Sequence, residues 1–144
     1  MTAVTRTLVV PSLSVWVPGR PAPQGSKELG EHGQMREASP YLPPWRQAIR
    51  RAVFERFREL GVKPADRPLY RGPVGISLMF HLDTGQRIDS APDLDKLQRA
   101  VWDALTKAKV WEDDGRVVDV QAGKRQATDS LGTGAFLRIW PVIP

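Results

Sequence analysis

Acidic side chains gather in residues 92–116, where their spacing is typical of ligands to a metal ion. Asp93 and Asp95 flank Leu94. If the backbone is extended there, alternate side chains point the same way, so both carboxylates face one direction while Leu94 faces the core. Two carboxylates held close together repel each other unless a hard cation lies between them. The pair therefore points to Mg²⁺, which binds one or two carboxylates and keeps several waters.

A second acidic segment, Glu112-Asp113-Asp114, follows the helix predicted after Asp95. That helix spans about 20 Å, so the segment can return to Asp93 only if the next strand runs back along the helix. Simpler interpretations remain open for both segments. Either Asp93 or Asp95 alone would serve as a helix N-cap, and Asp113-Asp114-Gly115 has the composition of a plain turn.

Three carboxylates around a cation suit the hydrolysis of a phosphodiester. Mg²⁺ held by aspartates can activate a water, neutralise charge on the phosphate and stabilise the leaving oxygen. The chain contains no P-loop, GxSxG or HExxH sequence, no cysteine and only two histidines. Those absences leave metal–carboxylate chemistry as the expected route, with Mg²⁺ as the cofactor and Mn²⁺ as an alternative.

Basic residues favour a polyanionic partner. The chain carries 21 Lys and Arg against 16 Asp and Glu, for a net charge of +5 and a pI near 10.0. Arg99 lies one helical turn from both Asp95 and Asp103, where it would either meet a phosphate or join a surface salt-bridge ladder. A row of arginines on the helix predicted at residues 44–61 is either solvated or faces DNA. Candidate DNA contacts are Lys27, Arg36, Arg46, Arg50, Lys96, Arg99 and Arg116.

Hydrophobic spacing predicts the elements that position these residues. Strands are expected at residues 13–17, 74–82, 117–120 and 135–140, and helices at residues 44–61 and 93–109. Residues 24–43, rich in Gly, Pro, Glu and Lys, are expected to form an extended or mobile loop with a functional role. The order β-α-β-α-β-β predicts an α+β fold in which two main helices pack on a mixed β-sheet.

Length and hydropathy bound the organisation of the chain. A length of 144 residues is typical of one domain, so we expect a single domain over residues 1–144. No run approaches eighteen apolar residues, and residues 1–11 lack the features of a signal peptide. We therefore expect a soluble intracellular protein located in the cytoplasm.

The segment 93–116 resembles the signature of the RusA family of Holliday junction resolvases, the crossover junction endodeoxyribonucleases. The stretches DLD, DALTKA and WEDD occur in the family's order. The resemblance implies a RusA-like fold and assigns the metal to Asp93, Asp95 and Asp114 rather than to Asp113. Similarity this strong covers about a sixth of the chain.

Two positions depart from the family's pattern. Arg99 stands where the family usually has lysine, so it keeps the positive charge but does not readily give up a proton. Lys96 stands where asparagine is common. The catalytic candidates are therefore Asp93, Asp95, Asp114 and Arg99, with a general-acid role for Arg99 unsupported.

The resemblance also implies a function and a partner. RusA-like proteins are homodimers that place two active sites on a four-way junction, so the expected activity is paired nicking of branched DNA in recombination and repair. Two alternatives remain open. One is a branched-DNA-binding module without catalysis, in which the aspartates serve as caps and turns. The other is a nuclease of broader structure specificity that acts on flaps or forks.

Overall fold

A four-stranded mixed sheet forms the centre of the protein. The computed structural model describes residues 10–25, 27–29, 33, 35–37, 39–85 and 87–143. The sheet strands are β1 (Leu13–Pro18), β4 (Val74–Leu82), β5 (Val117–Gln126) and β6 (Gly134–Pro141). They lie in the order β1-β6-β4-β5, and only the β4–β5 pair is parallel. This arrangement makes β5 an edge strand, and its place in the sheet matters for the site.

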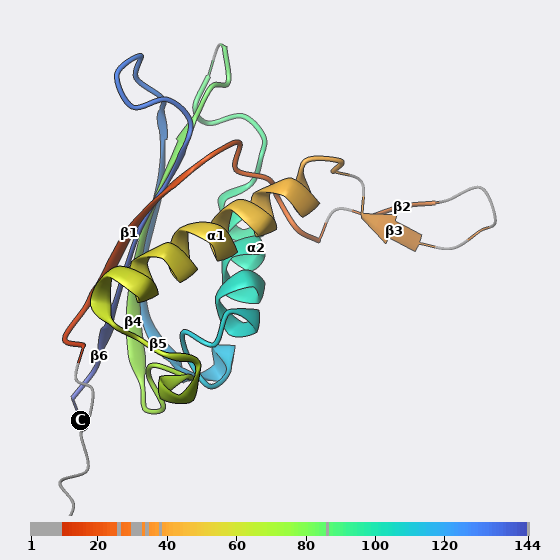
Figure 1. Ribbon diagram of the computed structural model, residues 1–144. Coiled ribbons are helices and arrows are strands. Elements are labelled where there is room, and N and C mark those ends of the chain that lie inside the picture. Colours follow the sequence, from red (N-terminus) through yellow and green to blue (C-terminus); the bar gives the residue numbers. More distant parts are fainter. Residues whose placement is uncertain are drawn as a thin grey trace, which may run out of the picture.

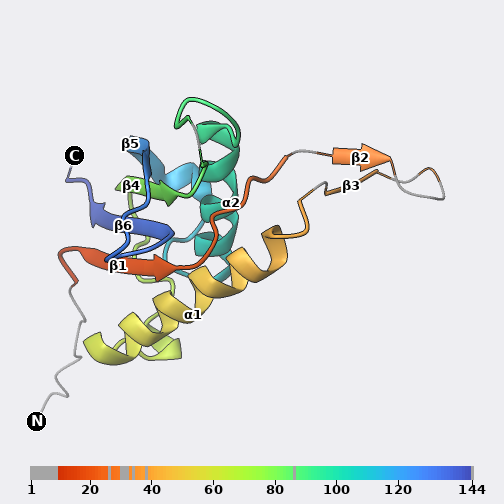
Figure 2. The same cartoon turned by 90° about the horizontal axis from the view of Figure 1, so that it is seen from above.

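Two helices cover one face of the sheet, α1 (Leu42–Leu60) and α2 (Leu94–Lys107) (Figures 1 and 2). In α1 every fourth residue is buried, which places Trp45, Ile49, Val53 and Phe57 in one apolar stripe. The helix ends at Gly61, whose φ of 74° gives the left-handed C-cap that glycine adopts without strain. The buried residues of α2 pack into the same core.

The β4–α2–β5 unit determines where the acidic residues lie. Since β4 and β5 are parallel neighbours, the chain must cross from the end of one to the start of the other, and α2 makes that crossing. A short 3-10 helix, η2 (Asp114–Arg116), stands between α2 and β5. Consequently the N-terminus of α2 lies near the end of β4, and η2 lies at the opposite end of α2 (Figure 1).

The predicted α+β fold is confirmed, with a mixed sheet and two packed helices. Two local predictions are wrong. The strand predicted at 117–120 extends to Gln126, because it pairs with β4 along its length although its residues there are mostly polar. The loop predicted at 24–43 contains an antiparallel hairpin of β2 (Lys27–Leu29) and β3 (Met35–Glu37), and a short 3-10 helix, η1 (Pro64–Asp66), follows α1. Among the described helices, none combines the length and apolar character that crossing a membrane requires.

Candidate active site

Asp93 and Asp95 lie together at the start of α2. Asp93 is the N-cap residue, with extended backbone angles, yet its side chain makes no capping hydrogen bond. Asp95 is in the first turn, and both residues are exposed. Leu94 between them packs against the core. A capping role therefore explains the backbone position of Asp93 but not its carboxylate, which faces solvent beside Lys96 Nζ at 3.9 Å.

The acidic turn separates into two different carboxylates. Asp113 accepts a hydrogen bond from the backbone N–H of Gly115 at 2.8 Å, so it caps η2. Asp114 is the first residue of η2 and is exposed, with no ion pair or side-chain hydrogen bond to another described residue. The plain-turn interpretation thus accounts for Asp113 and leaves Asp114 without a structural role.

The three predicted metal ligands do not meet within one chain. Asp114 lies at one end of α2 and the Asp93–Asp95 pair at the other, a separation of about 20 Å for a helix of this length. Within the part of the chain that the structure describes, no three His, Cys, Asp or Glu side chains are grouped so as to hold a metal ion. Strand β5 does run back along α2 toward Asp93. Asp114, however, lies before the start of β5, so the strand does not bring it back to the Asp93 end. One protomer therefore does not assemble the three-carboxylate site.

The loop before Asp93 is held by a lysine whose role the sequence analysis missed. Lys124 on β5 donates from Nζ to the carbonyl oxygens of Ser90, at 2.9 Å, and Pro92, at 3.0 Å. In the same loop the Arg87 guanidinium donates a hydrogen bond to each oxygen of the Asp89 carboxylate. These hydrogen bonds lower the pKa of the Asp89 carboxyl. These contacts fix the backbone that leads into Asp93.

Arg99 lies beside the segment that follows β1. A Cβ added to Gly25, whose φ is 103°, would come within 3.0 Å of the Arg99 guanidinium, so only glycine permits this approach. Of the two alternatives for Arg99, the structure does not show the salt-bridge ladder, since no ion pair joins Arg99 to Asp95 or Asp103 among the described residues. Instead, Asp103 pairs with Arg46 at 3.5 Å and with Lys107 at 3.1 Å. Arg99 is exposed and lies one helical turn after Asp95 on α2.

The remaining predicted DNA contacts lie in different surroundings. Arg46 is half-buried between the helices and donates to Gln24 as well as pairing with Asp103, so it joins α1 to α2. Arg116 bonds Glu112 at 2.7 Å, which lowers the pKa of the Glu112 carboxyl. Arg50 is exposed on α1. In the β2–β3 hairpin Lys27 pairs with Glu37 and Arg36 pairs with Glu28, and the side chains of Lys27 and Arg36 are not among those described.

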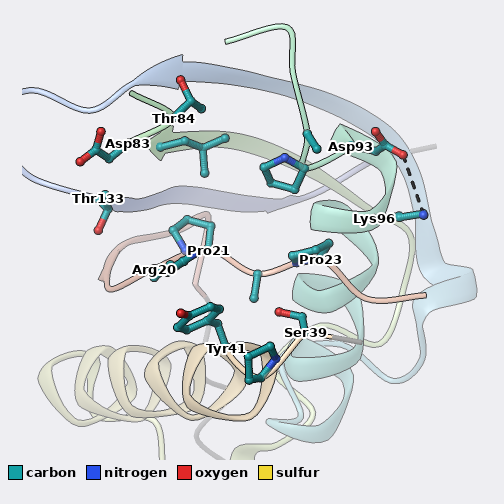
Figure 3. A pocket seen from close by; sticks show the side chains of 15 residues that line it. Arg20, Pro21, Pro23, Ser39, Tyr41, Asp83, Thr84, Asp93, Lys96 and Thr133 are labelled. Atoms are coloured by element: carbon teal, nitrogen blue, oxygen red, sulfur yellow. Dashed lines mark ion pairs between the residues drawn. The ribbon is translucent and has the colours of Figure 1, made fainter. Parts of the chain in front are cut away.

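A cleft of about 790 Å³ opens beside the start of α2, and Asp93 and Lys96 lie at its wall (Figure 3). Its other walls come from the segments at residues 20–23, 39–41, 82–84, 91–92 and Thr133. The cleft could not be predicted from the sequence, because its segments meet only in the folded chain.

The match to a known family covers a larger part of the chain than the signature at residues 93–116. The family model described as "Endodeoxyribonuclease RusA" matches residues 18–133. The chain belongs to the RusA family. The RusA match takes in both helices, β4 and β5, so the resemblance found at residues 93–116 is confirmed and reaches over most of the fold.

Individual RusA proteins are similar over a shorter segment. The chain is 45% identical over 56 residues to "Crossover junction endodeoxyribonuclease RusA" of Escherichia coli K12 and of Shigella sonnei Ss046. It has the same identity to the protein of that name from Enterobacteria phage 82. The aligned segment covers 39% of this chain and 43% of the length of each of these relatives.

Different structural roles for Asp113 and Asp114 predict different costs of removal. Asp113→Ala deletes a capping hydrogen bond and is expected to lower the free energy of unfolding by about 1 kcal/mol. Asp114→Ala, the matched control, removes an exposed carboxylate without a described partner and is expected to change it by less than about 0.5 kcal/mol. Urea unfolding followed by tryptophan fluorescence measures both values. Equal costs for the two variants would contradict the separation of roles.

Proposed function

We propose that this protein is a Mg²⁺-dependent endonuclease that resolves four-way DNA junctions by paired nicks, acting on nucleoid DNA during recombination and repair. The observation that carries the proposal is the pair of exposed carboxylates at the start of α2, from Asp93, whose side chain makes no capping hydrogen bond, and from Asp95 in the first turn. A carboxylate that does not cap its helix keeps its oxygens available to bind a hard cation. Membership of the RusA family supports the same conclusion.

We infer that the third ligand comes from a second copy of the chain. A two-fold axis near the middle of α2 would pair opposite ends of the two helices. Asp114 of the partner subunit would then lie beside Asp93 and Asp95. The edge strand β5 supports this arrangement, since Val118 and Val120 beside η2 are 60% and 41% exposed. Apolar side chains on an edge strand are suited to contact with another subunit.

The donor set fits a hard divalent cation. Asp93, Asp95 and Asp114 offer only carboxylate oxygens, and the described structure uses none of the three for capping. When bound, Mg²⁺ or Mn²⁺ supplies Lewis-acid activation of water and charge neutralisation at the scissile phosphate. Lys96 lies beside Asp93 and Arg99 follows one helical turn after Asp95, so their charges would hold and orient the phosphate. An arginine side chain suits charge stabilisation and orientation of a phosphate better than proton transfer, so the proposed role of Arg99 is electrostatic.

A synthetic four-way junction tests the proposed function. With Mg²⁺ the wild-type protein is expected to nick two strands symmetrically, and with EDTA it is expected to bind the junction without nicking it. Linear duplex, flap and fork substrates of the same sequence are the controls. Faster cleavage of flaps or forks than of the junction would contradict junction resolution and indicate a nuclease of broader structure specificity.

A binding module without catalysis is the second candidate, because one protomer does not group the three carboxylates. Retention of the junction that is insensitive to metal, with no nicked product under any condition, would establish that alternative and exclude the nuclease.

A further inference from the structure

Apart from Asp93 and Lys96, the residues that line the cleft have no role in the proposed cleavage chemistry. On one wall the Arg20 guanidinium lies 3.5 Å from the centroid of the Tyr41 ring, and this ring is 44% exposed. Figure 3 shows both side chains on the cleft, across from Asp83 and Thr84. A flat cationic and aromatic surface that remains open to solvent is a stacking platform for another planar group.

Proline rings and small polar groups make up most of the remaining lining. The apolar walls are Pro21, Pro23, Pro40 and Pro92. The side chains of Asp83, Thr84 and Thr133 line the opposite side and offer hydrogen-bonding groups. Lys96 adds a positive charge near the Asp93 end. Apolar faces, polar edges and a nearby cation match the chemistry of a nucleotide, with its planar base and its phosphate.

Hydrogen bonds to the rim hold the cleft open in the described structure. The backbone N–H of Gly19 donates to the carbonyl of Thr133 at 3.2 Å, and the Thr84 hydroxyl donates to Gln126 at 2.9 Å. Lys124 holds the carbonyl of Pro92 at the other side. The cavity of about 790 Å³ falls within the usual size of preformed sites for organic ligands, about 300–1,000 Å³.

We propose that this cleft receives an unstacked nucleotide of the DNA substrate, with its base on the Arg20–Tyr41 platform and its phosphate toward Lys96. The inference rests on the proposed function and adds to it a site for one base next to the cleaved strand. Bases at a branch point are less firmly stacked than bases in duplex DNA, so moving one into the cleft costs less there. The cleft thereby favours branched over linear DNA.

Photocrosslinking in EDTA tests the inference without any cleavage. A four-way junction carries 5-iododeoxyuridine at one nucleotide at a time around the branch point, and long-wavelength irradiation joins this base to an aromatic ring stacked on it. We expect a crosslink that mass spectrometry maps to Tyr41 at one of these positions. Tyr41→Phe is expected to keep the crosslink, whereas Tyr41→Ala is expected to lose it and to weaken junction binding about tenfold.

Phe136→Ala provides the matched control. Phe136 is 46% exposed, close to the value for Tyr41, but it lies on β6 and lines a groove formed by strand residues alone. Its removal is expected to leave both the Tyr41 crosslink and junction affinity unchanged. Because Tyr41 is exposed and makes no capping hydrogen bond, its variants are expected to melt like the wild type.

The outcomes separate the cleft from the nuclease. A protein that binds and nicks the junction, but gives no Tyr41 crosslink at any position, overturns the cleft inference alone. Crosslinks that survive in Tyr41→Ala overturn it as well. A protein that neither binds nor nicks the junction overturns the proposed function, and the cleft inference with it.

Discussion

Replacing Asp95 by asparagine is expected to slow junction nicking by at least about a thousandfold while leaving junction binding nearly unchanged. Asparagine has almost the same shape but no charge, so it binds a hard divalent cation far more weakly. Since the Asp95 carboxylate is exposed and makes no described contact, the substitution should not disturb the fold. Single-turnover nicking with Mg²⁺ and gel-shift titration in EDTA measure the two properties separately.

A charge-matched control isolates the position from the loss of negative charge. Glu55 is an exposed carboxylate on α1, so Glu55→Gln changes the net charge by the same amount away from the start of α2. It is expected to nick at the wild-type rate. Removing one negative charge should, if anything, strengthen DNA binding in both variants. Unchanged nicking by Asp95→Asn would exclude the carboxylate pair from catalysis.

Periodic apolar residues made most of the fold predictable from the sequence. The bounds of β4 are the predicted ones, and the stripe of four-residue spacings in α1 faces the core as expected. The second half of β5 could not be predicted, because its exposed polar residues join the sheet through backbone hydrogen bonds to β4, which depend little on side-chain type. The β2–β3 hairpin likewise lacks the apolar alternation that marks a buried strand.

The sequence placed two of the three candidate metal ligands together but did not predict where the third one lies. Asp93 and Asp95 could be predicted to be neighbours, since side chains two residues apart at the start of a helix are close in any fold. The position of Asp114 depends on the path of the chain from α2 into β5, which spacing alone does not determine. Residue type also did not distinguish Arg46, which joins the two helices, from the exposed Arg50.

A mixture of two inactive variants is expected to regain activity, because each site would draw its carboxylates from both subunits. In a dimer of one Asp95→Asn chain and one Asp114→Asn chain, both substitutions fall in the same site. The other site then keeps Asp93 and Asp95 from one chain and Asp114 from its partner. Equal mixing makes half the dimers mixed, each with one intact site, so about a quarter of the wild-type sites should return. Co-refolding the two variants and measuring the nicking rate tests this.

The products and a second mixture determine how the result is interpreted. A mixed dimer has a single working site, so it should release junctions nicked in one strand instead of in a symmetric pair. Mixing Asp93→Asn with Asp95→Asn should restore nothing, because those carboxylates belong to the same end of α2 and each site would keep one defect. If a site used Asp93, Asp95 and Asp114 of one chain, neither mixture would recover. Recovery in the first mixture alone would therefore establish that the two ends of α2 come together only between subunits. The length of α2 requires the same of any three-carboxylate site in this fold, because the helix separates Asp114 from Asp93 and Asp95 within one chain.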